Sequence, residues 1–419
     1  MLRTGVFGLL AGVVVSLCTG CVMSPAQRGD THPVAFIELT IEDAHQAIRE
    51  RRISCEQLTR RYLKRIETYD QPTQLNAIIY INPNAIERAR SLDEQYGITG
   101  RMKRLHCIPV ILKDNFDTAD MPTEAGSMAM RGANPPDDAF MVRRLRAQDA
   151  IVIAKSNMSE WAFSPYETVS STHGETRNAY DVSRVPAGSS GGTASAIAAN
   201  FGIIGMGTDT GNSIRGPASH LELVGLRSTI GVTSRDGIVP LLLNRDVGGP
   251  LMRNVTDTAI VFSVIAGVDA ADPATAAAAG RVQDDYTVYL KKDGLQGARL
   301  GVLRALVDSG DADLEVMTTM DRAIEELKAA GAVIVDPFEI PDFDRLRKAT
   351  GFCSRFRYDL QNYLLSRGPS APVHSLDEVA ATKRYLAMNE EAMQWAMSED
   401  GLPQDQQPPC VDVQGDPRR

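Results

Sequence analysis

The amino-acid sequence predicts an α/β fold, in which a mixed, largely parallel central sheet is covered by helices on both faces. Short unbroken apolar runs at 108–112, 150–154 and 203–207 alternate with longer stretches whose apolar residues recur at helical spacing. Strands that are buried on both faces have such runs, and helices connect strands that run in parallel. Composition agrees, because 419 residues, 43% of them hydrophobic and 23% charged, can bury a large core. Sheets of this kind place their functional sites in loops at the strand ends.

The expected elements begin with two amphipathic helices. The first follows Thr40, and the second follows a capping box formed by Ser54 and Gln57. After them the pattern predicts a strand at 77–81 and a helix that stops at Gly97. The alternating part then contains strands at 108–112, 150–154, 203–207, 300–303 and 332–335, and helices at 139–148, 193–200, 255–266, 317–330 and 376–395.

The N-terminus has the pattern of a targeting segment. Arg3 precedes an apolar stretch over 6–17, which is typical of a secretory signal and too short to span a bilayer. Gly20 and Cys21 resemble the bacterial lipobox, in which the cysteine becomes the lipidated first residue. We therefore expect residues 1–20 to be removed and the protein to be exported, either into the periplasm or as a lipoprotein anchored through Cys21.

The remaining chain is expected to form one domain over residues 34–400, followed by a polar tail at 401–419. Its net charge of −9 and the lack of long Lys/Arg runs speak against nucleic acid as a partner, since phosphate binding needs a concentrated basic face. The six histidines form no His-Glu-x-x-His pattern, which argues against a zinc hydrolase.

Besides Cys18 and Cys21, the chain has four cysteines, namely Cys55, Cys107, Cys353 and Cys410. Export permits disulfides, and four cysteines allow three pairings among which the sequence cannot choose. Because they are far apart and too few for a disulfide-rich scaffold, free buried thiols are the expectation.

Three polar segments lie at strand or helix ends, where a sheet of this kind places its functional residues. Lys113-Asp114-Asn115 follows an apolar run directly, a Gly-Ser-Ser-Gly-Gly segment at 188–192 opens an expected helix, and a polar loop at 207–217 follows another strand. Each segment alone also fits an ordinary role, as a solvated lysine or as a turn and helix cap.

Together these segments resemble the amidase signature family. There, a Gly-x-Ser-Ser-Gly-Gly segment lies 24 residues before the serine of a Gly-Gly-Ser-Ile-Arg-x-Pro segment, and Ser189 and Ser213 keep this spacing. Lys113 lies upstream in the matching Lys-Asp-Asn setting, and the likeness extends over about residues 41–374, most strongly to secreted bacterial peptide amidases. The resemblance implies the amidase signature fold and hydrolysis of a small amide or a peptide C-terminal amide, with no metal or organic cofactor.

The resemblance also implies a role for each motif residue. Ser213 would attack the amide carbonyl, Ser189 would accept its proton and relay it to Lys113, and the Gly188–Ser189 peptide bond would be cis. Lysine must be neutral to act as a base, so burial has to lower its pKa, and activity should rise on the alkaline side.

The loop before the nucleophile would stabilise the oxyanion. Backbone N–H groups of Thr210, Gly211, Asn212 and Ser213 lie on the segment that the family uses for this purpose. Asn212 replaces a glycine that is usual in the family, and we expect Asp209 and Arg215 to hold the loop rather than to touch substrate.

The chain departs from the family at its C-terminus, where the resemblance ends soon after residue 395. We therefore expect the C-terminal part of the family domain to be missing, and one alternative is a truncated, catalytically inactive envelope protein. Another alternative is an α/β-hydrolase-type serine esterase with Ser190 as nucleophile and His220 or His374 as its base. The tRNA-dependent amidotransferase branch of the family is disfavoured, since an exported acidic chain would not meet charged tRNA.

Overall fold

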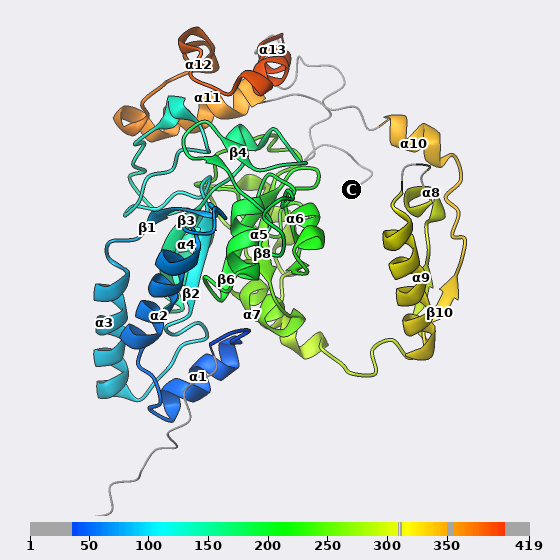
Figure 1. Cartoon of the computed structure of the whole chain (residues 1–419), viewed down its shortest axis with the longest axis horizontal. Helices are drawn as coiled ribbons and strands as arrows, with labels where there is room; N and C mark the ends of the chain where they lie inside the picture. Colours follow the sequence, from blue (N-terminus) through cyan, green and yellow to red (C-terminus); the bar gives the residue numbers. More distant parts are fainter. Residues whose placement is uncertain (1–35, 309, 311, 350–355, 399–419) are drawn as a thin grey trace, which may run out of the picture.

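The computed structural model describes residues 36–308, 310, 312–349 and 356–398, built around a six-stranded sheet of order β1-β3-β2-β6-β8-β7. β2 pairs in parallel with both β3 and β6, whereas β1 and β8 run antiparallel to their neighbours. Four strands thus share one direction, and helices surround the sheet (Figure 1), which confirms the predicted fold class. The strands are β1 (Ile78–Ile81), β2 (Pro109–Lys113), β3 (Ile151–Ser156), β6 (Ile204–Asp209), β7 (Val224–Gly225) and β8 (Val247–Met252).

The helices of the main body lie close to their predicted positions, except for α6, which was not predicted. Ser54 and Gln57 form the expected capping box, but the third helix continues past Gly97 to Thr99 and is capped by Gly100 in a left-handed conformation (φ 62°). No helix among the described residues is long and apolar enough to cross a membrane. The helices are α1 (Ile41–Arg49), α2 (Cys55–Tyr69), α3 (Ala85–Thr99), α4 (Phe140–Ala147), α5 (Gly191–Ala198), α6 (Arg215–His220) and α7 (Val255–Ile265), with a small hairpin of β4 (Val169–Ser170) and β5 (Gly174–Glu175).

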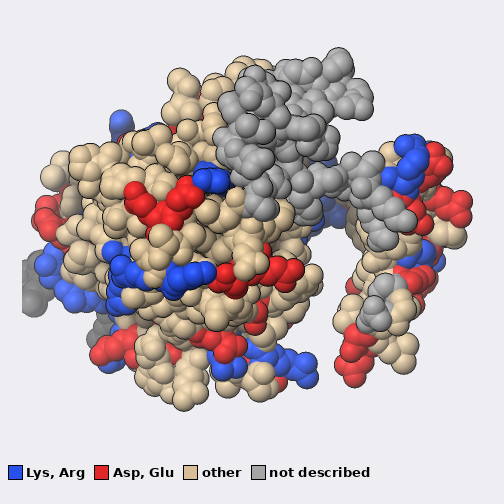
Figure 2. Space-filling view, turned by 90° about the horizontal axis from the view of Figure 1, so that it is seen from above, with Lys and Arg blue, Asp and Glu red and all other residues tan. Residues whose placement is uncertain are grey.

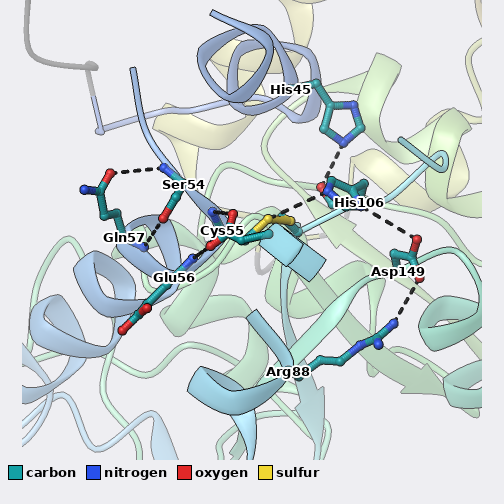
Figure 3. Close-up of a disulfide and its surroundings, with 10 residues drawn as sticks. His45, Ser54, Cys55, Glu56, Gln57, Arg88, His106 and Asp149 are labelled. Carbon is teal, nitrogen blue, oxygen red and sulfur yellow. Dashed lines mark hydrogen bonds and ion pairs between the residues drawn. A yellow bond between two sulfur atoms is a disulfide. The ribbon is translucent and has the colours of Figure 1, made fainter. Parts of the chain in front are cut away.

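Cys55 and Cys107 form a disulfide with a Cα–Cα distance of 5.2 Å, so the expectation of free thiols is wrong for this pair (Figure 3). Cys55 is the first residue of α2 and Cys107 lies just before β2, so only the tertiary fold brings them together. Cys353 and Cys410 lie outside the described residues, as do the expected signal at 1–20 and the expected tail at 401–419.

A second, smaller unit follows α7. β9 (Arg299–Gly301) and β10 (Val333–Val335) pair in parallel across α9 (Leu314–Ala329), which confirms both strands and the helix between them. They form a sheet of their own and do not extend the central one. Figure 1 and Figure 2 show this unit, with α8 (Arg304–Val307) and α10 (Phe343–Ala349), standing beside the main body.

The last described helices form a layer at the top of Figure 1. They are α11 (Phe356–Arg367), α12 (Leu376–Thr382) and α13 (Glu390–Ser398), and they pack on an apolar cluster that includes Trp161 and Phe356. The prediction of one helix over 376–395 is wrong, because Lys383 adopts a left-handed conformation (φ 52°) and ends α12. A lysine at this position does not predict a helix end, since glycine or asparagine is the usual residue there.

Candidate active site

The site lies where β2 and β6 end at the same edge of the sheet. Lys113 is the last residue of β2, and its Nζ donates hydrogen bonds to Ser189 Oγ at 2.7 Å and to Thr208 Oγ1 at 2.8 Å. The Lys113 and Ser189 side chains are wholly buried. The structure therefore brings together two of the predicted site residues, which are 76 positions apart in the sequence.

Burial controls the protonation of this lysine. Loss of solvation lowers the pKa of Lys113 to about 7, although the negative charges of Asp209 and Asp246 act in the opposite direction. Its direct partners are hydroxyl groups, which can either accept a hydrogen bond from the ammonium or donate one to a neutral amine. Lys113 can therefore exist as the free base near neutral pH, as the predicted chemistry requires.

The segment before α5 is held closely by its surroundings. The Gly188–Ser189 peptide bond is cis, as the resemblance implied. Gly188 N–H donates to Pro165 O at 3.0 Å, and Ser189 O accepts from Ser159 N–H at 3.1 Å. A Cβ on Gly188 would collide with the carbonyl oxygens of the neighbouring loop, so only glycine fits at this position.

Ser190 is not placed as a nucleophile. Its Oγ donates to Thr208 O at 3.1 Å and accepts from Thr208 N–H at 3.3 Å, so it joins α5 to β6. No strand leads directly into this segment, and His220 and His374 are both exposed. His220 pairs with a backbone carbonyl and His374 with a glutamate four residues away, so the geometry does not support the esterase alternative.

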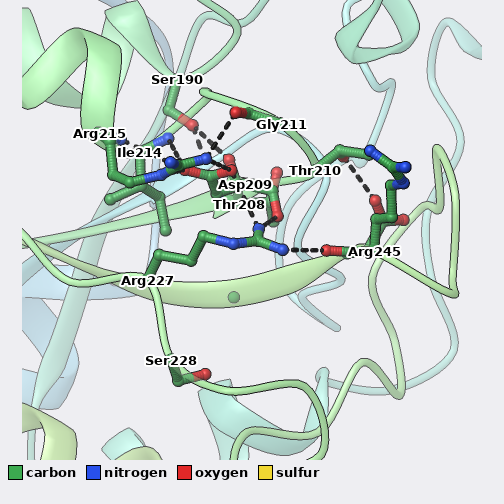
Figure 4. Close-up of polar contacts among 12 residues, drawn as sticks. Ser190, Thr208, Asp209, Thr210, Gly211, Ile214, Arg215, Arg227, Ser228 and Arg245 are labelled. Carbon is green, nitrogen blue, oxygen red and sulfur yellow. Dashed lines mark hydrogen bonds and ion pairs between the residues drawn. The ribbon is translucent and has the colours of Figure 1, made fainter. Parts of the chain in front are cut away.

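The loop after β6 is folded around one buried carboxylate (Figure 4). Asp209 accepts hydrogen bonds from Ile214 N–H at 3.2 Å and from Arg215 Nε at 3.0 Å, and Arg227 Nη1 lies 3.0 Å away. Burial tends to raise the pKa of Asp209, but the bond from Arg215 leads the opposing effects and the pKa ends below its usual value. Arg215 also donates to Gly211 O at 2.5 Å, which confirms that Asp209 and Arg215 hold the loop.

The turn formed in this way leaves four backbone donors free. Among the residues that the structure describes, none accepts a hydrogen bond from the N–H groups of Thr210, Gly211, Asn212 or Ser213. The Asn212 side chain instead donates to Pro165 O at 3.3 Å, the same carbonyl that accepts from Gly188. One carbonyl thus joins the two serine-bearing loops.

Comparison with known proteins identifies the family. A family model described as amidase matches residues 57–406. A probable amidase of Arabidopsis thaliana is 33% identical over 372 residues, which cover 85% of this chain and 70% of the plant protein. The native peptide amidase of Stenotrophomonas maltophilia superimposes with a TM-score of 0.79 at 38% identity, over 88% of this chain and 77% of that one. The chain belongs to the amidase signature family.

Other relatives of this amidase show how wide the family is. A glutamyl-tRNA(Gln) amidotransferase polypeptide of Caldanaerobacter subterraneus is 35% identical over 328 residues, which are 77% of this chain and 65% of that polypeptide. An amidase family protein of Bacillus anthracis has a TM-score of 0.80 at 32% identity, over 88% of this chain and 74% of that one. The chain thus spans about two thirds to three quarters of these relatives.

Two residues of the amidase site were not found by sequence reasoning. Arg227 also holds Asp209, but it lies in an ordinary-looking loop. Lys155 is wholly buried in β3 and donates to Phe116 O at 2.6 Å, with Asp114 Oδ1 at 3.9 Å. Because these contacts anchor the segment after β2, Lys155 supports the position of the neighbouring strand end. The signal for it was a lysine directly after the apolar run at 150–154, as Lys113 directly follows the run at 108–112.

One described group of side chains has the spacing of a metal site. It consists of Cys55, His106 and Cys107, and it lies at the start of β2, whereas Lys113 is at its end.

Proposed function

We propose that this amidase forms an acyl-enzyme at Ser213, with Ser189 as the proton relay and Lys113 as the base. The observation that carries the proposal is the 2.7 Å hydrogen bond between Lys113 Nζ and Ser189 Oγ, two side chains that are both wholly buried. A neutral Lys113 takes the Ser189 proton while Ser189 takes that of Ser213.

The Ser213 oxygen then bonds to the carbonyl carbon, and the C–N bond breaks as the relay returns the proton to the leaving nitrogen. Water hydrolyses the acyl-serine by the same route and releases the carboxylic acid. The free N–H groups at 210–213 are suited to stabilise the oxyanion of both steps, and one such donor contributes about 3–4 kcal/mol.

The substrate class that we propose is a peptide C-terminal amide. It is supported by the likeness to the peptide amidase of Stenotrophomonas maltophilia at 38% identity. A panel of peptide amides, simple aliphatic amides and anilides tests this, with ammonia release as the measurement for the first two. Equal turnover of all three classes would contradict a preference for peptide amides.

A serine-directed fluorophosphonate followed by peptide mapping tests the catalytic assignment. We expect one adduct on Ser213, no adduct in Ser213→Ala, and slow labelling in Lys113→Ala. An adduct on Ser190 would support the esterase alternative. Failure to label a chain shown to be folded by circular dichroism would support the inactive envelope protein.

We also propose that residues 1–20 direct export and that Cys21 is lipidated, on the strength of the sequence pattern. Expression of the full chain in a bacterium, fractionation and mass analysis of the N-terminal peptide test both points. A lipid-modified Cys21 in the membrane fraction is expected. An unprocessed N-terminus in the cytosol would refute export, and a processed but unmodified one would refute lipidation.

A further inference from the structure

The disulfide region contains a histidine, His106, in addition to its two cysteines (Figure 3). Cys55, His106 and Cys107 are all buried, and their sulfur and ring nitrogen atoms lie within 4.8 Å of one another. His106 Nε2 is 3.7 Å from Cys55 Sγ. A structural disulfide needs no imidazole beside it, so the histidine requires a separate explanation.

The backbone at this point favours the convergence of the three side chains. Residues 105–108 form a turn closed by the hydrogen bond from Ile108 N–H to Leu105 O at 3.0 Å. Cys107 adopts a left-handed conformation (φ 65°) within it, where glycine or asparagine is the usual residue. For a residue other than glycine, this backbone conformation costs conformational free energy on the order of 1–3 kcal/mol. Residues held in such conformations are concentrated at functional sites. The turn thus places two adjacent side chains beside Cys55.

The imidazole of His106 is oriented in the way that metal ligands are. Its Nδ1 faces Asp149 Oδ2 at 3.7 Å, and Asp149 is itself anchored by Arg88 at 3.0 Å and Lys103 at 3.2 Å. The other ring nitrogen of His106, Nε2, faces the sulfur of Cys55 at 3.7 Å. A carboxylate behind a histidine is the usual outer partner of a zinc-bound ring.

We propose that, when its disulfide is reduced, the cluster of Cys55, His106 and Cys107 binds one Zn²⁺ through both sulfurs and His106 Nε2. A dithiol reductant transfers two electrons and two protons to the disulfide and is itself oxidised to a disulfide. Zn²⁺ then displaces the two thiol protons, and two thiolates neutralise the cation, so the site buries no net charge.

The geometry suits this ion. Ligand bonds of 2.0–2.3 Å at a tetrahedral zinc put a sulfur and a nitrogen about 3.6 Å apart, close to the 3.7 Å between His106 and Cys55. Cys55 is also the first residue of the 15-residue helix α2, whose N-terminus stabilises a thiolate. Three protein ligands leave a fourth position for water. Disulfide and zinc use the same sulfur atoms, so each state excludes the other.

Cobalt titration of the full chain tests the proposal, because Co²⁺ reports thiolate ligands through a sulfur-to-metal charge-transfer band and zinc displaces it. We expect the reduced chain to bind one Co²⁺ with this band and the oxidised chain to bind none at the cluster. Cys55→Ser should abolish the band, and Asp149→Asn should weaken binding by about 10–100-fold, as for other outer partners.

A variant in which Cys18, Cys21, Cys353 and Cys410 are all serine is the matched control, and it should bind as the wild type does. A reduced wild-type chain without the charge-transfer band would overturn the proposal, as would equal Co²⁺ binding by reduced and oxidised chains. This comparison uses one sequence in two redox states, so it remains decisive even where a cysteine variant does not fold.

Discussion

The pH dependence of Ser213 reactivity is the most direct test of the buried base. The test first varies the pH and then repeats the pH series with Asp246→Asn. This substitution removes a buried negative charge, and that charge raises the pKa of Lys113 in the native chain. With a pKa of about 7, half of Lys113 is neutral at pH 7, whereas an ordinary lysine with a pKa of about 10.4 is neutral in roughly 0.04% of molecules. Burial thus increases the fraction of free base about a thousandfold.

The direction of the pH dependence follows from the role of Lys113. The base must be neutral, so the rate of Ser213 labelling and kcat/KM should rise tenfold per pH unit well below pH 7 and level off above about pH 8. Asp246→Asn should move the midpoint to lower pH, because the ammonium loses a favourable charge. In the native chain Asp246 accepts from Thr210 Oγ1 through Oδ1 and from the N–H groups of Leu241 and Leu242 through Oδ2. Asparagine can keep the two backbone bonds with its amide oxygen and donate from its NH2 group to Thr210 Oγ1. The surface variant Glu87→Gln is the control.

The assay is the second-order rate constant for fluorophosphonate labelling of Ser213, measured from about pH 5 to about pH 11, a range that brackets both values of the lysine pKa. It needs no knowledge of the substrate, and the same buffers serve for kcat/KM on a peptide amide. A midpoint near pH 10, or Asp246→Asn and wild-type profiles that coincide, would refute the assignment of Lys113 as a base tuned by burial.

Other substitutions test the packing and the polar contacts of the site. Gly192→Ala places a Cβ against backbone of a neighbouring segment, so unfolding should show a loss of about 1–3 kcal/mol, whereas Gly211→Ala meets open space and should unfold like the wild type. Replacing Cys55 and Cys107 by serine opens a link across 52 residues and should lower the unfolding free energy in denaturant by about 4 kcal/mol; an unchanged midpoint without reductant would contradict a closed disulfide. Asp209→Asn weakens the contacts to two arginines, so kcat should fall by up to about 10²–10³-fold with KM less affected, and a wild-type kcat would show that the loop holds without them.

The sequence predicted most of the central sheet because its strands are buried on both faces. The runs that became β2, β3 and β6 are apolar without interruption, and each appears within two residues of its predicted place. Motif spacing likewise predicted that Lys113 and Ser189 belong to one site, and the structure places them in contact.

Two of the failures have a common physical cause, since both depend on contacts between distant segments. The disulfide joins Cys55 to Cys107 only because α2 packs beside the start of β2, and no local pattern records that. β9 and β10 were recognised as strands, but whether they extend the central sheet is decided by long-range pairing. The break at Lys383 contradicts local helix propensity, which rates lysine well.

Two buried lysines on adjacent strands show why the identity of a partner matters more than burial. Loss of solvation lowers the pKa of both Lys113 and Lys155. Lys155 faces the carbonyl of Phe116 and the carboxylate of Asp114, which can only accept and therefore favour the ammonium form. Its third partner, the Thr123 hydroxyl at 3.0 Å, already donates to Phe116 O and so accepts from the lysine as well. Lys113 is hydrogen-bonded to the hydroxyls of Ser189 and Thr208, and a hydroxyl can reverse its role and donate to a neutral amine. The same strand-end architecture thus holds one lysine as a charged support and leaves the other free to give up its proton, which is the property that a catalytic base needs.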